Sequence, residues 1–140
     1  MAQILLIEDN AINMKLAVML LEHAGHTVLT AENAEEGIRL AGEHIPELIL
    51  MDIQLPGDMD GLDATRALRS DISTCDIKIV AMSACVLQRD FEAVEAAGCD
   101  GFVAKPIDIK GFLKTVEETL AEGRVALVKR RLSRKYPVTD

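Results

Sequence analysis

The chain has 140 residues, 49% of them hydrophobic and 27% charged, which indicates one folded domain with its own core. This balance excludes a disordered or fibrous chain, and no apolar run approaches the ~20 residues that span a bilayer. A formal net charge of −8 argues against nucleic acid as the main partner.

The first residues and the cysteines bear on the compartment of the protein. Met1-Ala2-Gln3 leads straight into a strand-like segment without a basic region, so we expect no signal peptide. The three cysteines, Cys75, Cys85 and Cys99, are odd in number and lack C-x-x-C spacing. Reduced thiols in a cytoplasmic protein are the simplest interpretation.

Five short apolar segments alternate with helix-forming segments along the chain. Strands are predicted at Gln3–Ile7, Thr27–Ala31, Leu48–Met51, Ile77–Met82 and Gly101–Ala104. Helices are predicted at Ala11–Ala24, from the cap residue Asn33 to about Glu43, at Leu62–Leu68, at Leu87–Ala97, and from the cap residue Asp108 to Gly123. This alternation implies a parallel sheet covered on both faces. Five units in this length fit an α/β, flavodoxin-like (βα)5 doubly wound sheet with strand order 2-1-3-4-5 better than an eight-fold barrel, which needs ~250 residues.

The third apolar segment, Leu48–Met51, runs into Asp52 and then into the turn Pro56-Gly57. Its four consecutive apolar residues are typical of a central strand that is buried on both faces. Because burying an unpaired charge costs several kcal/mol, we expect Asp52 at the open end of this strand.

Other polar residues follow the remaining strands in the same way. Glu8 and Asp9 end the first strand, Ser83 ends the fourth and Lys105 ends the fifth. The carboxyl ends of parallel strands converge on one crevice where ligands bind, so these residues are expected to share a pocket with Asp52. Each alone has an ordinary role as a helix cap, a loop former or a solvated charge, but their joint placement is hard to account for in that way.

This set of side chains suits phosphoryl transfer. Three carboxylates in a small space repel one another unless one is protonated or a cation is present, and oxygen ligands suit a hard ion such as Mg²⁺. The Ser83 hydroxyl and the Lys105 ammonium can donate hydrogen bonds to phosphate oxygens, and an Asp can act as a nucleophile toward phosphorus. The sequence therefore predicts phosphoryl transfer to Asp52.

With these residues the chain resembles the receiver domain of two-component response regulators, in the CheY-like superfamily, over residues 3 to about 122. The motifs that carry the resemblance are Glu8-Asp9-Asn10, Met51-Asp52-Ile53-Gln54-Leu55-Pro56, Met59-Asp60-Gly61-Leu62, Ser83-Ala84 and Lys105-Pro106, in the order and spacing of that family. The opening Glu8-Asp9-Asn10-x-x-Asn13 most resembles receivers of hybrid-kinase relays and small single-domain regulators of the DivK type.

The resemblance implies that Asp52 accepts a phosphoryl group from a histidine kinase or a histidine phosphotransfer protein. It also implies that Glu8, Asp9, Asp52 and the Gln54 backbone carbonyl hold Mg²⁺ or Mn²⁺, that Ser83 and Lys105 contact the phosphoryl group, that Phe102 is the rotating switch aromatic, and that the Lys105–Pro106 peptide bond is cis. A downstream protein would bind the face formed by the fourth helix, the fifth strand and the fifth helix.

Two positions depart from the pattern of that family. Gly57 and Asp58 separate Pro56 from Met59, which is one residue more than usual. Phe102 stands where Tyr is commoner, so it cannot donate a hydroxyl hydrogen bond. Both differences concern loop geometry and output rather than the phosphorylation chemistry.

The predicted function is that of a stand-alone receiver in which residues 1–123 form a phosphorylation-controlled binding module rather than a conventional enzyme. A receiver excised from a hybrid histidine kinase is one alternative. An Mg²⁺-dependent phosphotransferase or phosphatase that acts on a small substrate through an aspartyl-phosphate is another, although short loops without a substrate-capping insertion argue against it. We expect no DNA-binding domain and no transmembrane segment, and a homodimer stays open.

Charge is distributed unevenly along the chain. Residues 1–123 hold 9 Lys and Arg against 22 Asp and Glu, a net −13, whereas the tail at 124–140 holds 6 basic residues and 1 acidic one, a net +5. Apolar residues lie among the basic ones in this tail, at Val125, Leu127, Val128 and Leu132. We expect the tail either to dock on an acidic surface or on anionic lipid, as a short helical extension, or to be solvated.

Overall fold

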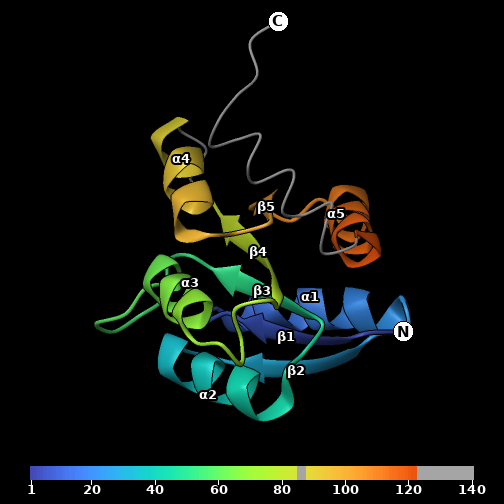
Figure 1. Cartoon of the computed structure of the whole chain (residues 1–140). Coiled ribbons are helices and arrows are strands. Elements are labelled where there is room, and N and C mark those ends of the chain that lie inside the picture. Colours follow the sequence, from blue (N-terminus) through green and yellow to red (C-terminus); the bar gives the residue numbers. More distant parts are fainter. Residues whose placement is uncertain (85–87, 123–140) are drawn as a thin grey trace, which may run out of the picture.

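The computed structural model describes residues 1–84 and 88–122, and in these residues five strands form one parallel sheet with five helices around it (Figure 1). The strands are β1 (Gln3–Ile7), β2 (Thr27–Ala31), β3 (Leu48–Asp52), β4 (Lys78–Ser83) and β5 (Gly101–Ala104). The helices are α1 (Ala11–His23), α2 (Ala34–His44), α3 (Gly61–Ser70), α4 (Gln88–Ala97) and α5 (Ile109–Ala121). The sheet order β2-β1-β3-β4-β5 confirms the predicted flavodoxin-like fold.

Each face of the sheet has its own apolar cluster, because the central strands are buried on both sides. Ile49 and Ile79 belong to the cluster that α2, α3 and α4 cover, whereas Leu50 and Val80 belong to the cluster under α1 and α5. Figure 1 shows this division, with α1 and α5 on one side of the sheet and the other three helices on the opposite side. Helices therefore close both faces, and polar groups are left to the two edges where the strands begin and end.

The polar residues that follow the strands also start the next helices. The side-chain oxygen of Asn10 accepts hydrogen bonds from two backbone amides in the first turn of α1, each at 3.0 Å. Asn33 caps α2 in the same way, and Asp60 with Asp63 forms a capping box at the start of α3. This capping box begins α3 at Gly61, and the helix continues to Ser70, beyond the predicted range of Leu62–Leu68.

The fourth strand is shifted by one residue from its predicted range. It covers Lys78–Ser83 rather than Ile77–Met82. The Ile77 amide closes the preceding turn on the Thr74 carbonyl at 3.1 Å, and Ser83 still pairs with Ala104 in the neighbouring strand. Ser83 is therefore the last residue of the strand and not the first residue after it.

The described chain ends close to the end of α5. This helix ends at Ala121 rather than at Gly123, and Glu122 has an extended backbone. The tail predicted at 124–140 and the thiol of Cys85 lie outside the described residues, while Cys75 and Cys99 are free thiols. Among the helices of residues 1–84 and 88–122, none is long and apolar enough to cross a membrane.

A buried ion pair joins three elements at the amino edge of the sheet. The guanidinium Nη2 of Arg69, at the end of α3, lies 2.9 Å from Asp100 Oδ2, just before β5. The same carboxylate oxygen accepts a hydrogen bond from the Ile79 amide of β4 at 2.8 Å. Arg69 Nε also donates to the Gly98 carbonyl at 2.9 Å, which fixes the turn that leaves α4.

Candidate functional site

Asp52 is the last residue of β3, between β1 and β4 at the carboxyl edge of the sheet. It is only 2% exposed, and its Oδ1 accepts a hydrogen bond from the backbone amide of Gln54 at 2.9 Å. A Cβ at Gly61 would collide with the backbone carbonyl of Asp52. Glycine at that position therefore lets α3 begin directly against the strand end that carries the carboxylate.

Lys105 pairs with two carboxylates at once. Its Nζ lies 2.7 Å from Glu8 Oε2 and 2.9 Å from Asp52 Oδ2. Its backbone amide donates to the Ser83 carbonyl at 2.9 Å, and the bond from Lys105 to Pro106 is a cis peptide. The segment after β5 thus brings one ammonium group between acids that follow β1 and end β3.

Glu8 and Asp9 directly follow β1. Glu8 is 1% exposed, and its Oε1 accepts a hydrogen bond from the Asn10 amide at 3.1 Å, whereas Asp9 is exposed. One carboxylate oxygen from each of Glu8, Asp9 and Asp52 lies within 4.8 Å of the other two. The site therefore has two buried acids and a third that faces solvent.

Burial and charge shift two pKa values in this cluster. Burial raises the pKa of Glu8 above its usual value, and the neighbouring Asp52 adds to that effect, while the hydrogen bond from Lys105 opposes it. Burial alone would lower the pKa of Lys105, but its hydrogen bonds to Glu8 and Asp52 and their negative charges outweigh burial and raise it. The cluster thus keeps its ammonium charged and contains one acid whose ionisation is unfavourable.

An open hollow of about 490 Å³, which we call the carboxyl-edge hollow, lies over these groups. Its lining includes five residues that were predicted for the site, namely Glu8, Asp9, Asp52, Gln54 and Lys105. Asn10, Asn13, Ala84 and Pro106 complete the lining. The sequence predicted a cis peptide bond before Pro106 but no role in the site for the other three. All four lie within the motifs of the family resemblance, and this is the signal that could have found them.

Ser83 and Phe102 do not line the carboxyl-edge hollow. Ser83 is fully buried at the end of β4, next to Ala84. Phe102 lies on β5, three residues before Lys105, and its ring meets that of Phe91 on α4 edge to face, with centroids 4.8 Å apart and an interplanar angle of 62°. The aromatic contact between α4 and β5 therefore involves a residue of the same short segment that carries the ammonium group of the site.

The donor set of the site fits a hard divalent cation. Its clustered acidic ligands are all carboxylate oxygens, which suit Mg²⁺ together with water and phosphate oxygens. Such an ion would offset the excess of three carboxylates over one ammonium group. The ion and the Lys105 ammonium would be two cations beside one restrained carboxylate, and positive charge there stabilises the negative charge of a phosphoryl group under attack.

Comparisons with known proteins identify relatives of this chain. A family model described as the response regulator receiver domain matches residues 4–117. The polar-differentiation response regulator DivK of Brucella anthropi is 37% identical over 119 residues, which cover 85% of this chain and 96% of that protein. The receiver domain of the sensor histidine kinase PA1611 of Pseudomonas aeruginosa, solved with a magnesium ion coordinated in its active site cleft, is 30% identical with a TM-score of 0.80, and the match covers 86% of this chain and 98% of that one. The chemotaxis protein CheY4 of Vibrio cholerae has the same fold, with a TM-score of 0.80 at 24% identity over 85% of this chain and 98% of that one.

Proposed function

This chain belongs to the response regulator receiver domain family, and we propose that it accepts a phosphoryl group on Asp52 from a histidine kinase or a histidine phosphotransfer protein. The observation that carries the proposal is the two-sided restraint on the Asp52 carboxylate. The backbone amide of Gln54 donates a hydrogen bond to Oδ1, and the ammonium of Lys105 donates one to Oδ2, both at 2.9 Å. A carboxylate held in this way loses little freedom when it reaches the transition state.

The transfer exchanges one bond for another. A carboxylate oxygen of Asp52 forms a bond to phosphorus while the phosphorus–nitrogen bond of the donor histidine breaks, and the released imidazole nitrogen takes up a proton. Lys105 then moves its hydrogen bond from the carboxylate to a phosphoryl oxygen, so that its positive charge follows the negative charge of the transferred group.

Mg²⁺, or Mn²⁺ in its place, is the cofactor that we propose. Glu8, Asp9 and Asp52 would hold the ion, with the Gln54 backbone carbonyl as a further ligand. When bound, the ion supplies positive charge that balances the phosphoryl oxygens. Glu8 and Asp52 also repel each other less beside a cation, and the raised pKa of Glu8 supports that assignment.

Ser83 and Phe102 carry the response to phosphorylation in this proposal. The Ser83 hydroxyl moves toward the phosphoryl group, and Phe102 turns inward in response. The edge-to-face contact of Phe102 with Phe91 would then change, and with it the surface of α4, β5 and α5 that binds a downstream protein. This is a shift between two populated states of one molecule.

The phosphoryl donor would dock on α1, beside the site. Ile12 is 80% exposed and Met19 is 59% exposed on this helix. A mostly apolar hollow of about 690 Å³ runs from Asp9 along α1 past Met14 and Val18. An exposed apolar helix face suits the apolar face of a partner helix, and here it adjoins the acids that surround Asp52.

We also propose that the chain works in the cytoplasm as a separate regulator that binds partners, with its own catalysis limited to forming and hydrolysing the aspartyl-phosphate. DivK of Brucella anthropi is itself a response regulator, and the match covers 96% of its length. One receiver domain is thus enough for a regulator of this kind, which supports this function over an excised part of a kinase.

Replacement of the nucleophile tests the proposal. Asp52→Asn is nearly isosteric, so it should keep the fold, but it should abolish acid-labile labelling by a histidine kinase and by a small phosphoramidate. Asp58→Asn is the matched control, because Asp58 is an exposed Asp in the same β3–α3 connection, and it should be labelled at the wild-type rate. Labelling of Asp52→Asn at the wild-type rate would mean that another residue accepts the phosphoryl group.

A further inference from the structure

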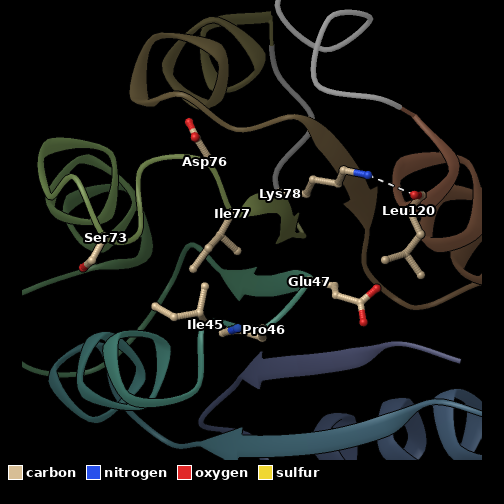
Figure 2. Close-up of a pocket in the computed structure, with 8 residues that line it drawn as sticks. All are labelled: Ile45, Pro46, Glu47, Ser73, Asp76, Ile77, Lys78 and Leu120. Atoms are coloured by element: carbon tan, nitrogen blue, oxygen red, sulfur yellow. Dashed lines mark hydrogen bonds between the residues drawn. The ribbon is translucent and has the colours of Figure 1, made fainter.

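A second hollow, which we call the amino-edge hollow, lies at the edge of the sheet where the strands begin (Figure 2). Its apolar lining comes from Ile45, Pro46, Ile77 and Leu120, and Ile45 is 48% exposed. Figure 2 shows Ile45 and Ile77 pointing toward each other beside Pro46. The volume of about 290 Å³ lies at the lower limit of small-molecule sites, which run from ~300 to 1,000 Å³, so side chains of a peptide fit better than a cofactor.

The chain leaves the last described helix beside this hollow. Lys78 Nζ donates hydrogen bonds to the Leu120 carbonyl at 2.9 Å and to the Glu122 carbonyl at 2.6 Å, the first of which is drawn in Figure 2. These bonds anchor the end of α5, where Leu120 itself lines the hollow. Four residues span at most ~14 Å, so the chain from Leu120 to Arg124 keeps the following segment within reach of the hollow.

The charges of the amino-edge hollow complement those of that segment. Glu47 and Asp76 line the hollow and are both exposed. The ammonium of Lys78 is directed at the carbonyl end of α5, where the helix dipole is negative. Residues 124–132 contain four basic and no acidic residues, with Val125, Leu127, Val128 and Leu132 among them.

We propose that residues 124–132 of this chain dock across the amino-edge hollow of the same molecule. Apolar side chains of the segment cover Ile45, Ile77 and Leu120, while its basic side chains face Glu47 and Asp76. Attraction between exposed charges is weak and screened by salt, so apolar contact supplies most of the affinity and charge selects this surface. The docking is independent of phosphorylation, because the hollow lies at the opposite edge of the sheet from Asp52.

A spin label in the tail of the full chain tests this docking. The label is attached to Ser133→Cys after Cys75→Ser and Cys85→Ser, and Cys99, at 2% exposure, stays unreactive. Amide signals of Ile45, Glu47 and residues 76–78 should lose intensity, several-fold more than those of residues 8–10 at the opposite edge. The charge reversal Glu47→Lys with Asp76→Lys should weaken this loss, as should Lys129→Glu with Arg130→Glu, which changes no residue of the folded body.

Matched control variants separate docking at this hollow from a general effect of net charge. Glu32→Lys with Glu92→Lys changes the net charge equally at two exposed acids away from the hollow and should leave the signal loss intact, as should Asp52→Asn. Uniform loss over the whole surface, or no loss at Ile45, Glu47 and residues 76–78, would overturn the proposal. A mixed sample tests the remaining alternative. In it one chain carries the isotope label without a spin label, and the other carries the spin label without the isotope. Loss of signal in the isotope-labelled chain would also overturn the proposal, because the tail would then occupy a second copy.

Discussion

At the scale of single residues, Glu8 carries the unfavourable charge of the site, because its carboxylate is buried beside Asp52 and Lys105 compensates it only in part. Its pKa in the folded chain is raised above the usual 4.5, so between these two values the folded state binds more protons than the unfolded state. The free energy of unfolding that this group contributes is therefore greatest below pH 4.5 and is lost as the pH rises through the raised pKa.

A divalent cation should restore the free energy of unfolding that the ionisation of Glu8 removes. We predict that Mg²⁺ raises the melting temperature more at pH 7 than near pH 4.5, because protons and the ion compete for the same oxygens. At an ion concentration of 100 times Kd the gain in the free energy of unfolding should be about 2.7 kcal/mol. Thermal unfolding with and without Mg²⁺ over this pH range measures it. Asp9→Asn should reduce the gain in stability from Mg²⁺ at pH 7, and the control Asp58→Asn should not. An equal gain in the wild type at both pH values would contradict the assignment of the metal site.

At the scale of elements, α1 offers more apolar surface than its packing needs. Ala17 and Leu21 are buried against the sheet, yet Ile12 and Met19 face solvent. We predict that Ile12→Ala slows phosphotransfer from a protein donor by about tenfold, the effect of losing ~1.4 kcal/mol at an interface. The free energy of unfolding of this variant should change by no more than ~0.5 kcal/mol, as for substitutions at other exposed positions.

The donor separates docking from chemistry in this experiment. Labelling of Ile12→Ala by a small phosphoramidate should stay at the wild-type rate, because that donor needs no docking surface. Ile72→Ala is the matched control, since Ile72 is 93% exposed on the connection between α3 and β4, and it should affect neither donor. An equal loss with both donors would place the effect of Ile12 on the site itself rather than on docking.

Helices and strands that have a periodic apolar pattern, or a capping residue at one end, could be predicted from the sequence. Contacts between polar residues that lie far apart in the chain could not. Apolar runs gave the strands, and the parallel arrangement brought Glu8, Asp52 and Lys105 to one edge. Arg69 and Asp100 are generic surface residues in the sequence, 31 positions apart, and only the packing of α3 against the sheet buries their ion pair. The contact of His26 with Glu117 spans 91 positions and has the same origin.

At the scale of the whole molecule, the sheet separates two working edges. Asp52 ends β3, whereas the amino-edge hollow adjoins Glu47 just before this strand. A strand of five residues is ~17 Å long, and substitutions more than ~7–10 Å apart usually have additive effects on stability. The phosphoryl site and the proposed docking surface of residues 124–132 should therefore act independently.

We predict that a chain ending after Gly123 has a lower melting temperature but keeps the wild-type rate of labelling by a phosphoramidate and the full gain in stability from Mg²⁺. Removing the +5 tail leaves a −13 body whose charges repel one another, so the loss should be larger at low salt than at 1 M, where the Debye length is ~3 Å. The effect of truncation and that of Asp9→Asn should add to within ~0.3–0.5 kcal/mol in denaturant unfolding. A larger coupling energy, or slower labelling of the shortened chain, would mean that the tail reaches the carboxyl edge of the sheet and bears directly on the acids around Asp52.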